Sequence, residues 1–136
     1  MKLLLDTHIA LWAISNNVKL SEKARELILD EKNDIYYSTA SVWEITIKHM
    51  AKPNQIFESG KSFAEDCNTM GYRNLPIYDI HVSYIESLEF DDEGKHIEHH
   101  DPFDRILIAQ AKAEGMFLLT SDLKIPYYHE NCVISV

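Results

Sequence analysis

The sequence predicts an α/β domain in which helices cover both faces of a mostly parallel β-sheet. Short strand-like segments alternate along the chain with helical segments, the order that builds parallel sheets. The first such strand, Lys2–Leu5, carries an unbroken apolar run, as expected for a strand buried on both faces. Asp6 and Asp122 each come just after an expected strand, at the edge where such sheets bind ligands.

The N-terminal third contains two expected strands and two helices between them. The strand Lys2–Leu5 leads into a helix over His8–Ile14. Ser21 is a typical N-cap residue and predicts a second helix over Glu22–Leu29. Isoleucine and tyrosine favour extended backbone, so the next strand is expected at Ile35–Tyr37.

A longer helix is expected to begin among the residues Ser38–Ser41, which offer several N-caps, and to end near Ala51, before Pro53. Three apolar side chains recur on it at helical spacing and form one stripe, composed of Trp43, Ile47 and Met50. Glu44 borders this stripe, which predicts a position at the boundary of the core.

The middle of the chain carries weaker signals. A helix is expected over Lys61–Met70, with Gly71 just past its end as the C′ residue. A short strand is expected at Leu75–Ile77 and a helix over Ile80–Leu88. The polar and aperiodic stretch Phe90–Glu98 predicts an exposed loop.

The C-terminal third opens with a helix whose start is dense in charged residues. Pro102 lacks a backbone N–H and suits the first turn, and Asp104 follows where the helix dipole favours a negative charge. Gly115 marks the end of this helix. The last two strands are expected at Met116–Leu119 and Cys132–Val136.

Length and composition favour one globular domain. The chain has 136 residues, of which 46% are hydrophobic, enough to build a core. Its net charge of −9 argues against a broad basic surface for nucleic acid, although metal-binding carboxylates of a nuclease would add to the same excess. We expect a cytoplasmic protein, because the sequence lacks a membrane-length apolar run and a secretory signal, and because Cys67 and Cys132 lack metal-site spacing.

Four acidic residues each have an ordinary structural explanation. Asp6 would cap a helix, and Glu44 would pair with Lys48 four residues later. Asp104 would complement the helix dipole, and Asp122 would suit a turn. Their common feature is position, because all four would lie near the same edge of the sheet. Four converging carboxylates repel one another unless a cation neutralises them.

The expected cation is Mg²⁺ or Mn²⁺, because carboxylate oxygens without cysteine suit these ions better than zinc. Such an ion orients and activates water at a phosphodiester and stabilises the charge that develops on the phosphate. The residues alone therefore predict an acidic metal site in an α/β domain that is suited to phosphoryl chemistry.

Four blocks of sequence stand out together. They are Leu4-Leu5-Asp6-Thr7-His8 with Trp12, Ser38-Thr39-Ala40-Ser41-Val42-Trp43-Glu44-Ile45 with Lys48, His99-His100-Asp101-Pro102-Phe103-Asp104-Arg105 through Ala109-Gln110-Ala111, and Leu119-Thr120-Ser121-Asp122. In order and separation the blocks resemble the PIN-domain ribonucleases and, within them, the VapC-like toxins of bacterial type II toxin–antitoxin pairs. The resemblance implies a single PIN-like domain over residues 1–136, with three layers around a central parallel sheet.

The resemblance also implies a Mg²⁺-dependent endoribonuclease, with Mn²⁺ as an alternative ion. The acidic quartet of the family would be Asp6, Glu44, Asp104 and Asp122. Of these, Asp6, Asp104 and Asp122 would bind the metal directly or through water. Glu44 would hold a water molecule or a second ion.

Residues beside the quartet would orient its carboxylates. The hydroxyl groups in question belong to Thr7, Ser41 and Thr120. Asp101 also matches the family pattern, but it precedes a helix and is expected as its N-cap. Arg105 would either grip an RNA phosphate or form an ion pair within the acidic cluster.

Two further features concern the surroundings of this site. His8 and His99 are expected to make structural hydrogen bonds rather than a zinc site, because their spacing fits no standard zinc pattern. The acidic loop 91–98 departs from the family pattern, and its role stays open.

The resemblance implies protein partners as well. A VapC-like toxin would form a homodimer and would be silenced by a cognate antitoxin that lies across the active-site groove. An antitoxin arginine would then occupy the acidic site, and the negative charge of the chain suits such a basic partner.

Three alternatives stay open. A phosphoacceptor signalling domain would require an aspartate closing a middle strand, whereas Ser38 follows Ile35–Tyr37, and it would require a lysine after a later strand, whereas Thr120 follows Leu119. A catalytically silent binding module could share the fold. DNA could replace RNA as the substrate.

Overall fold

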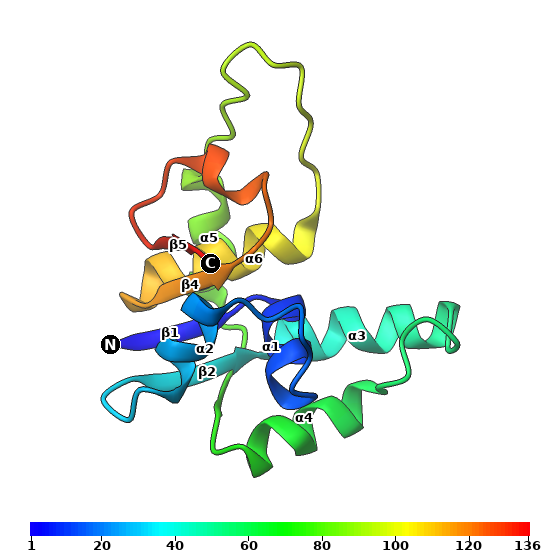
Figure 1. Cartoon of the computed structure of the whole chain (residues 1–136). Helices are drawn as coiled ribbons and strands as arrows, with labels where there is room; N and C mark the ends of the chain where they lie inside the picture. Colours follow the sequence, from blue (N-terminus) through cyan, green and yellow to red (C-terminus); the bar gives the residue numbers. More distant parts are fainter.

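Five strands form one parallel sheet with the order β3-β2-β1-β4-β5. A computed structural model that describes residues 1–136 has this arrangement (Figure 1). The strands are β1 (Lys2–Leu5), β2 (Asp34–Ser38), β3 (Arg73–Leu75), β4 (Phe117–Thr120) and β5 (Val133–Ser135). Parallel neighbours need crossover connections, and helices supply them, so the α/β fold class predicted from the sequence is confirmed.

The central strand β1 is buried on both faces. Leu3, Leu4 and Leu5 have no exposed surface, and successive side chains of a strand point to opposite faces. Leu3 and Leu5 belong to one hydrophobic core, whereas Leu4 belongs to a second core. The unbroken apolar run at the N-terminus therefore reflects two cores, one on each face of the sheet.

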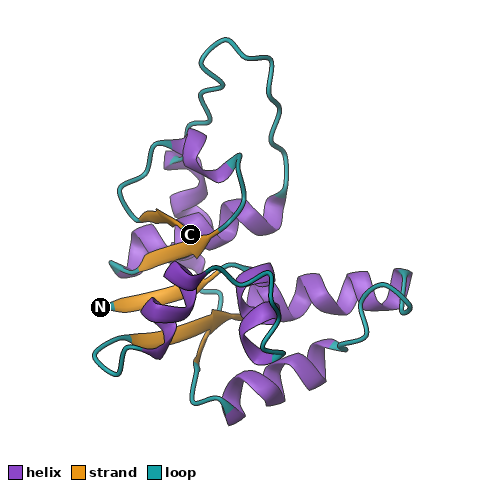
Figure 2. Cartoon of the chain, in the orientation of Figure 1, coloured by secondary structure: helices purple, strands orange, loops and turns teal.

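Helices cover both faces of the sheet (Figure 2). Ile9 of α1, Ala24 of α2 and Phe63 of α4 enter the core around Leu3, whereas Leu107 of α6 enters the core around Leu4. The α-helices are α1 (Thr7–Ile14), α2 (Glu22–Leu29), α3 (Thr39–Ala51), α4 (Gly60–Thr69), α5 (Asp79–Tyr84) and α6 (Pro102–Glu114). None of them combines the length and the apolar character that a membrane span requires.

The strand register brings three chain segments to one edge of the sheet. Leu5 of β1 pairs with Leu119 of β4, and the backbone N–H of Asp6 donates to the Leu119 carbonyl at 3.0 Å. On the other side of β1, strand β2 ends at Ser38, and α3 begins at the next residue. The residues that follow β1, β2 and β4 therefore meet at the carboxyl edge, where ligands bind in such sheets.

The expected elements differ from the structure mainly in the middle of the chain. The strand expected at Leu75–Ile77 is β3, which ends at Leu75 because Pro76 has no N–H to donate to a neighbouring strand. The expected helix Ile80–Leu88 is α5 followed by a 3₁₀ helix over Ile85–Ser87. A second 3₁₀ helix, at Ile125–Tyr128, was not expected from the sequence.

The loop predicted over Phe90–Glu98 is confirmed, since these residues have no regular secondary structure and most are exposed. In Figure 1 this segment rises from the top of the molecule. Phe90, at its base, is half-buried and stacks on the His99 ring at a centroid distance of 5.7 Å. The loop is therefore anchored at its start rather than exposed throughout.

The apolar stripe of α3 faces outward. Trp43, Ile47 and Met50 are 57%, 45% and 78% exposed, whereas Glu44 is only 4% exposed. The buried face of the helix also carries the polar residue Ser41. Glu44 is therefore more buried than the stripe that it borders, because polar partners hold its carboxylate inside while the apolar stripe stays in solvent.

Candidate active site

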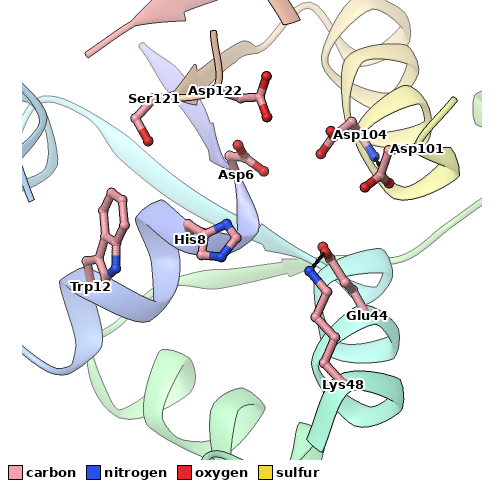
Figure 3. A pocket seen from close by; sticks show the side chains of 9 residues that line it. All are labelled: Asp6, His8, Trp12, Glu44, Lys48, Asp101, Asp104, Ser121 and Asp122. Carbon is pink, nitrogen blue, oxygen red and sulfur yellow. Dashed lines mark hydrogen bonds and ion pairs between the residues drawn. The ribbon is translucent and has the colours of Figure 1, made fainter. Parts of the chain in front are cut away.

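Acidic side chains from four chain segments line one pocket of about 300 Å³ (Figure 3). They come from the end of β1, from α3, from the start of α6 and from the turn after β4. The pocket is lined by Asp6, His8, Trp12, Glu44, Lys48, Asp101, Asp104, Ser121 and Asp122. The structure therefore brings together all four acids that the sequence predicts to converge.

Asp6 is fixed at both carboxylate oxygens. Oδ1 accepts a hydrogen bond from the backbone N–H of Thr7 at 2.8 Å, which caps α1, and Oδ2 accepts one from Thr120 Oγ1 at 2.7 Å. Burial raises the pKa of Asp6, whereas the hydrogen bonds from Thr120 and Thr7 lower it. Asp6 is thus both the helix cap expected from the sequence and a rigid member of the pocket.

Glu44 is held by the hydroxyl group of Thr7 on α1, which also contacts the hydroxyl group of Ser41 on α3. Thr7 Oγ1 lies 2.7 Å from Glu44 Oε1 and 2.9 Å from Ser41 Oγ. A hydroxyl group has one proton, so Thr7 donates to the carboxylate and accepts from Ser41. Thr7 and Thr120 therefore lie against the carboxylates of Glu44 and Asp6, as expected, whereas Ser41 lies against Thr7.

Lys48 is a functional candidate that the sequence predicts only as a surface partner of Glu44. Its Nζ lies 2.6 Å from Glu44 Oε2, and the side chain is 45% exposed. Burial lowers the pKa of Lys48, but the hydrogen bond and charge of Glu44, followed by the charges of Asp101 and Asp104, raise it overall. The spacing of four residues was the available signal, because it places Lys48 on the same helix face as Glu44.

Asp101 caps α6, as expected. Its Oδ1 accepts hydrogen bonds from the backbone N–H groups of Phe103 at 2.8 Å and Asp104 at 3.2 Å. Pro102 occupies the first helical position, where no N–H is needed. This cap fixes the backbone of the first turn of α6, from which the Asp104 side chain extends into the pocket.

Asp104 experiences the combined charge of the pocket. Burial raises its pKa to about 8, with further contributions from Asp6, Asp101, Asp122 and Glu44. On the side chain itself, Oδ2 lies 2.9 Å from Nε2 of His99. Because every other acid of the pocket acts on Asp104, the five carboxylates form one electrostatic unit.

Asp122 lies in a tight turn after β4. Its Oδ1 accepts hydrogen bonds from the backbone N–H groups of Lys124 at 2.7 Å and Ile125 at 3.2 Å, and its own N–H donates to Thr120 Oγ1 at 3.0 Å. The turn role expected for Asp122 is therefore present together with its place in the pocket. Thr120 joins this turn to Asp6.

The expectation for His8 is wrong, and of the two roles left open for Arg105 the ion pair is not formed. Arg105 forms no ion pair with the acids, because its guanidinium donates instead to Tyr128 Oη at 3.1 Å and to the His99 carbonyl at 2.7 Å. His8 makes no hydrogen bond; its exposed ring lies beside Trp12 at a centroid distance of 5.9 Å. His99 does make the structural hydrogen bonds predicted for it.

The donor set of the pocket fits a hard divalent cation. Carboxylate oxygens are the ligands that Mg²⁺ and Mn²⁺ prefer, and a cation would relieve the repulsion that raises the pKa of Asp104. No group of three or more His, Cys, Asp or Glu side chains is arranged to hold a metal ion by itself. Mg²⁺ is usually bound through one or two carboxylates and several water molecules, so such an ion would not require three carboxylates at coordinating distance.

The sequence as a whole matches one protein family. A family model described as PIN domain matches residues 3–130. The chain belongs to the PIN domain family. PIN domains are generally nucleases, and the match confirms the resemblance found in the sequence. A search of the curated proteins finds no match.

Solved structures share the PIN fold over almost the whole chain. VapBC2 from Rickettsia felis, bound to a DNA fragment from their promoter, is 18% identical, with a TM-score of 0.69 over 100% of this chain and 98% of that one. FitAcB from Neisseria gonorrhoeae is also 18% identical, with a TM-score of 0.61 over 98% and 96%. FitAB bound to an IR36 DNA fragment is 21% identical, with a TM-score of 0.51 over 98% and 94%. At sequence identities of 18–21%, the similarity to these structures shows a shared fold and no more.

Proposed function

We propose that this PIN domain is a Mg²⁺-dependent endoribonuclease that acts as the toxin of a toxin–antitoxin pair. One observation carries the proposal: Asp6, Glu44, Asp104 and Asp122 come from distant parts of the chain and line the same pocket. Nuclease activity follows from the family, whereas the RNA substrate, the metal and the toxin role rest on the chemistry of this pocket and on the resemblance to VapC-like toxins.

In this proposal Asp6, Asp104 and Asp122 hold the Mg²⁺ or Mn²⁺, directly or through water, and Glu44 holds a water molecule or a second ion. When bound, the ion lowers the pKa of a water molecule and stabilises negative charge on the scissile phosphate. Burial and four neighbouring acids raise the pKa of Asp104. This supports the assignment, because a bound cation would stabilise the charged form of the Asp104 carboxyl group.

The residues of the chain itself fix the geometry of the reaction. Thr7 and Thr120 hold the two oxygens of Asp6, so that the carboxylate does not rotate away from the pocket. Lys48 is the one lysine that lines the pocket, and we assign it to the RNA phosphate, which an ammonium group binds as a point charge. Five of the other residues that line the pocket are acids, which repel a phosphate.

We expect hydrolysis without a covalent enzyme intermediate. Ser121 and His8 both line the pocket, but no hydrogen bond joins them, so the pocket lacks a serine activated by a base. A water molecule is therefore the nucleophile in this proposal, and the carboxylates that surround it accept its proton.

The experiment compares cleavage of a single-stranded RNA and a DNA of the same sequence by the purified chain, in Mg²⁺ and in EDTA. We expect cleavage of the RNA in Mg²⁺ and background levels in EDTA or in Asp6→Asn. Asp34→Asn is the matched control, because Asp34 is exposed at the start of β2, at the opposite edge of the sheet. Cleavage that survives EDTA or Asp6→Asn contradicts the proposal, and cleavage of DNA alone assigns DNA as the substrate.

The proposed protein partner is an antitoxin that places an arginine in the acidic pocket. The net charge of −9 and the cluster of carboxylates favour a basic segment at this place. The fold shared with VapBC2 and FitAB supports the same partner class. We expect the product of a small neighbouring gene to co-purify with the chain and to inhibit its cleavage of RNA; a neighbour that does neither contradicts this role.

The second proposed partner is another copy of the chain, docked on the outward stripe of α3. Trp43, Ile47 and Met50 leave an apolar helix face in solvent, and Trp43 extends it onto α6 by packing on Phe103 at a centroid distance of 5.0 Å. A homodimer would remove this face from water. Because this apolar face lies beside the pocket, the two active sites of such a dimer would lie near the interface.

A further inference from the structure

A chain of polar groups lies behind Asp104, outside the lining of the acidic pocket. Nε2 of His99 is 2.9 Å from Asp104 Oδ2, and Nδ1 of the same ring is 2.7 Å from Tyr128 Oη. Arg105 Nε donates to Tyr128 Oη at 3.1 Å. His99 and Tyr128 are 6% and 5% exposed, so these contacts are made away from bulk water.

The direction of each hydrogen bond in this chain follows from its first member. Arginine is always charged and only donates, so Tyr128 Oη accepts from Arg105. The hydroxyl proton of Tyr128 then has one acceptor within reach, Nδ1 of His99. An imidazole that accepts at Nδ1 carries its proton at Nε2, and this proton points at Asp104. The donors therefore run from Arg105 through Tyr128 and His99 to the carboxylate.

The His99 ring is also held by packing. Phe90, at the base of the loop, stacks on it with an angle of 22° between the ring planes. Tyr128 meets the same ring edge-on, at a centroid distance of 5.4 Å. Arg105 Nη2 binds the backbone carbonyl of His99 at 2.7 Å.

We propose, on the basis of the metal-dependent function above, that His99 is a positioning residue that holds the Asp104 carboxylate in place for the divalent cation, with Tyr128 selecting its tautomer. Asp104 is otherwise free to turn, because no other side chain binds its oxygens. A histidine that orients a metal-binding carboxylate affects the metal without touching it, and removing such a partner typically costs 10–100-fold in metal affinity.

The first test measures Mn²⁺ binding by calorimetry in the wild type, His99→Leu and His99→Gln, with thermal unfolding followed in parallel. We expect His99→Leu to weaken binding by about tenfold or more. His99→Gln keeps an N–H donor near the position of Nε2 and should recover most of the affinity. His100→Leu is the control, because His100 is its exposed neighbour with a 77% exposed side chain. Equal affinity in wild type and His99→Leu, or equally weak binding in both His99 variants, overturns the proposal.

The second test does not depend on a stable variant. A long-range ¹H–¹⁵N spectrum of the metal-free wild type reports which ring nitrogen of His99 carries the proton. We expect Nε2–H in the wild type and a gain of Nδ1–H in Tyr128→Phe, and Nδ1–H in the wild type overturns the proposal. A wild type that binds no Mn²⁺ defeats the proposed function as well, whereas binding that is insensitive to His99 defeats this inference alone.

Discussion

Single acids in this pocket combine a structural role with a place in the site. Asp6 caps α1, Asp101 caps α6, and Asp122 closes a turn, so each has the ordinary role that its local sequence suggests. The same hydrogen bonds fix the direction of each carboxylate. Asp104 differs, because the one side chain that hydrogen-bonds to its carboxylate is His99, and burial raises its pKa to about 8.

The raised pKa of Asp104 predicts how stability depends on pH without metal. The folded protein binds the Asp104 proton up to about pH 8, whereas the unfolded chain releases it near the ordinary value of 3.8. The folded state thus holds more protons between these values, and its unfolding free energy should fall as pH rises. From pH 5 to pH 8 in EDTA we expect a larger fall in the wild type than in Asp104→Asn, by more than about 1.4 kcal/mol, the equivalent of one pKa unit.

Urea denaturation of both proteins across this pH range measures the difference. Asp104→Asn keeps the size of the side chain and removes the charge. A difference between the two pH profiles therefore reports on the charge of Asp104 and not on packing. Parallel pH profiles for the two proteins would show that Asp104 does not carry the repulsion of the pocket.

At the level of single residues, spacing and local sequence were enough to predict the four converging acids and the Asp101 cap, whereas the hydroxyl groups of Thr7 and Ser41 were predicted from the resemblance to the PIN-domain ribonucleases. Spacing and local sequence were not enough for the contact between His99 and Asp104. That contact depends on the irregular path of residues 99–101 into α6 and on Tyr128, which comes from an unexpected 3₁₀ helix. Arg105 likewise binds Tyr128 of that helix rather than the acids of the pocket.

Helix α3 shows what a periodic pattern leaves undetermined. Periodicity separates two faces of a helix, and an apolar face is ordinarily the buried one. Here Thr7 and Lys48 bind the two carboxylate oxygens of the buried Glu44, and Ser41 binds Thr7. The inner face of the helix is therefore the polar one, and the apolar stripe stays in solvent. Gly60 at the start of α4 fixes the position of α3, because a Cβ there would collide with Thr46 Oγ1. Two of the residues that hold α3 in this orientation, Thr7 and Gly60, lie on the other helices α1 and α4.

The outward stripe predicts the oligomeric state. Ile47→Glu adds a charge to the centre of the stripe, so it should convert a wild-type dimer into a monomer without lowering the unfolding temperature, since Ile47 is already 45% exposed. Sedimentation equilibrium gives the mass. Val18→Glu is the matched control, because Val18 is an isolated apolar residue that is 96% exposed. A monomeric wild type, or a dimer that persists in Ile47→Glu, contradicts the assignment of this face.

For the whole molecule, the order of elements predicted the parallel sheet but not which strands are neighbours. The pairing of β1 with β4 is what places Asp6 beside Thr120 and Asp122, although these residues come from opposite ends of the chain. The pairing of β1 with β2 places the start of α3, with Ser41 and Glu44, on the other side of Asp6. Long-range pairing of this kind cannot be predicted from local sequence. Only the positions of Asp6 and Asp122, each just after an expected strand, indicated it.

The central claim is that a divalent cation binds among these carboxylates, and its position can be measured directly. Crystals of the wild type grown with Mn²⁺ give an anomalous difference map in which manganese stands out from the protein. We predict a peak in the pocket between Asp6 and Asp104, and its loss in crystals of Asp104→Asn. A manganese peak elsewhere with none in this pocket, or a peak that is unchanged in Asp104→Asn, would contradict the claim.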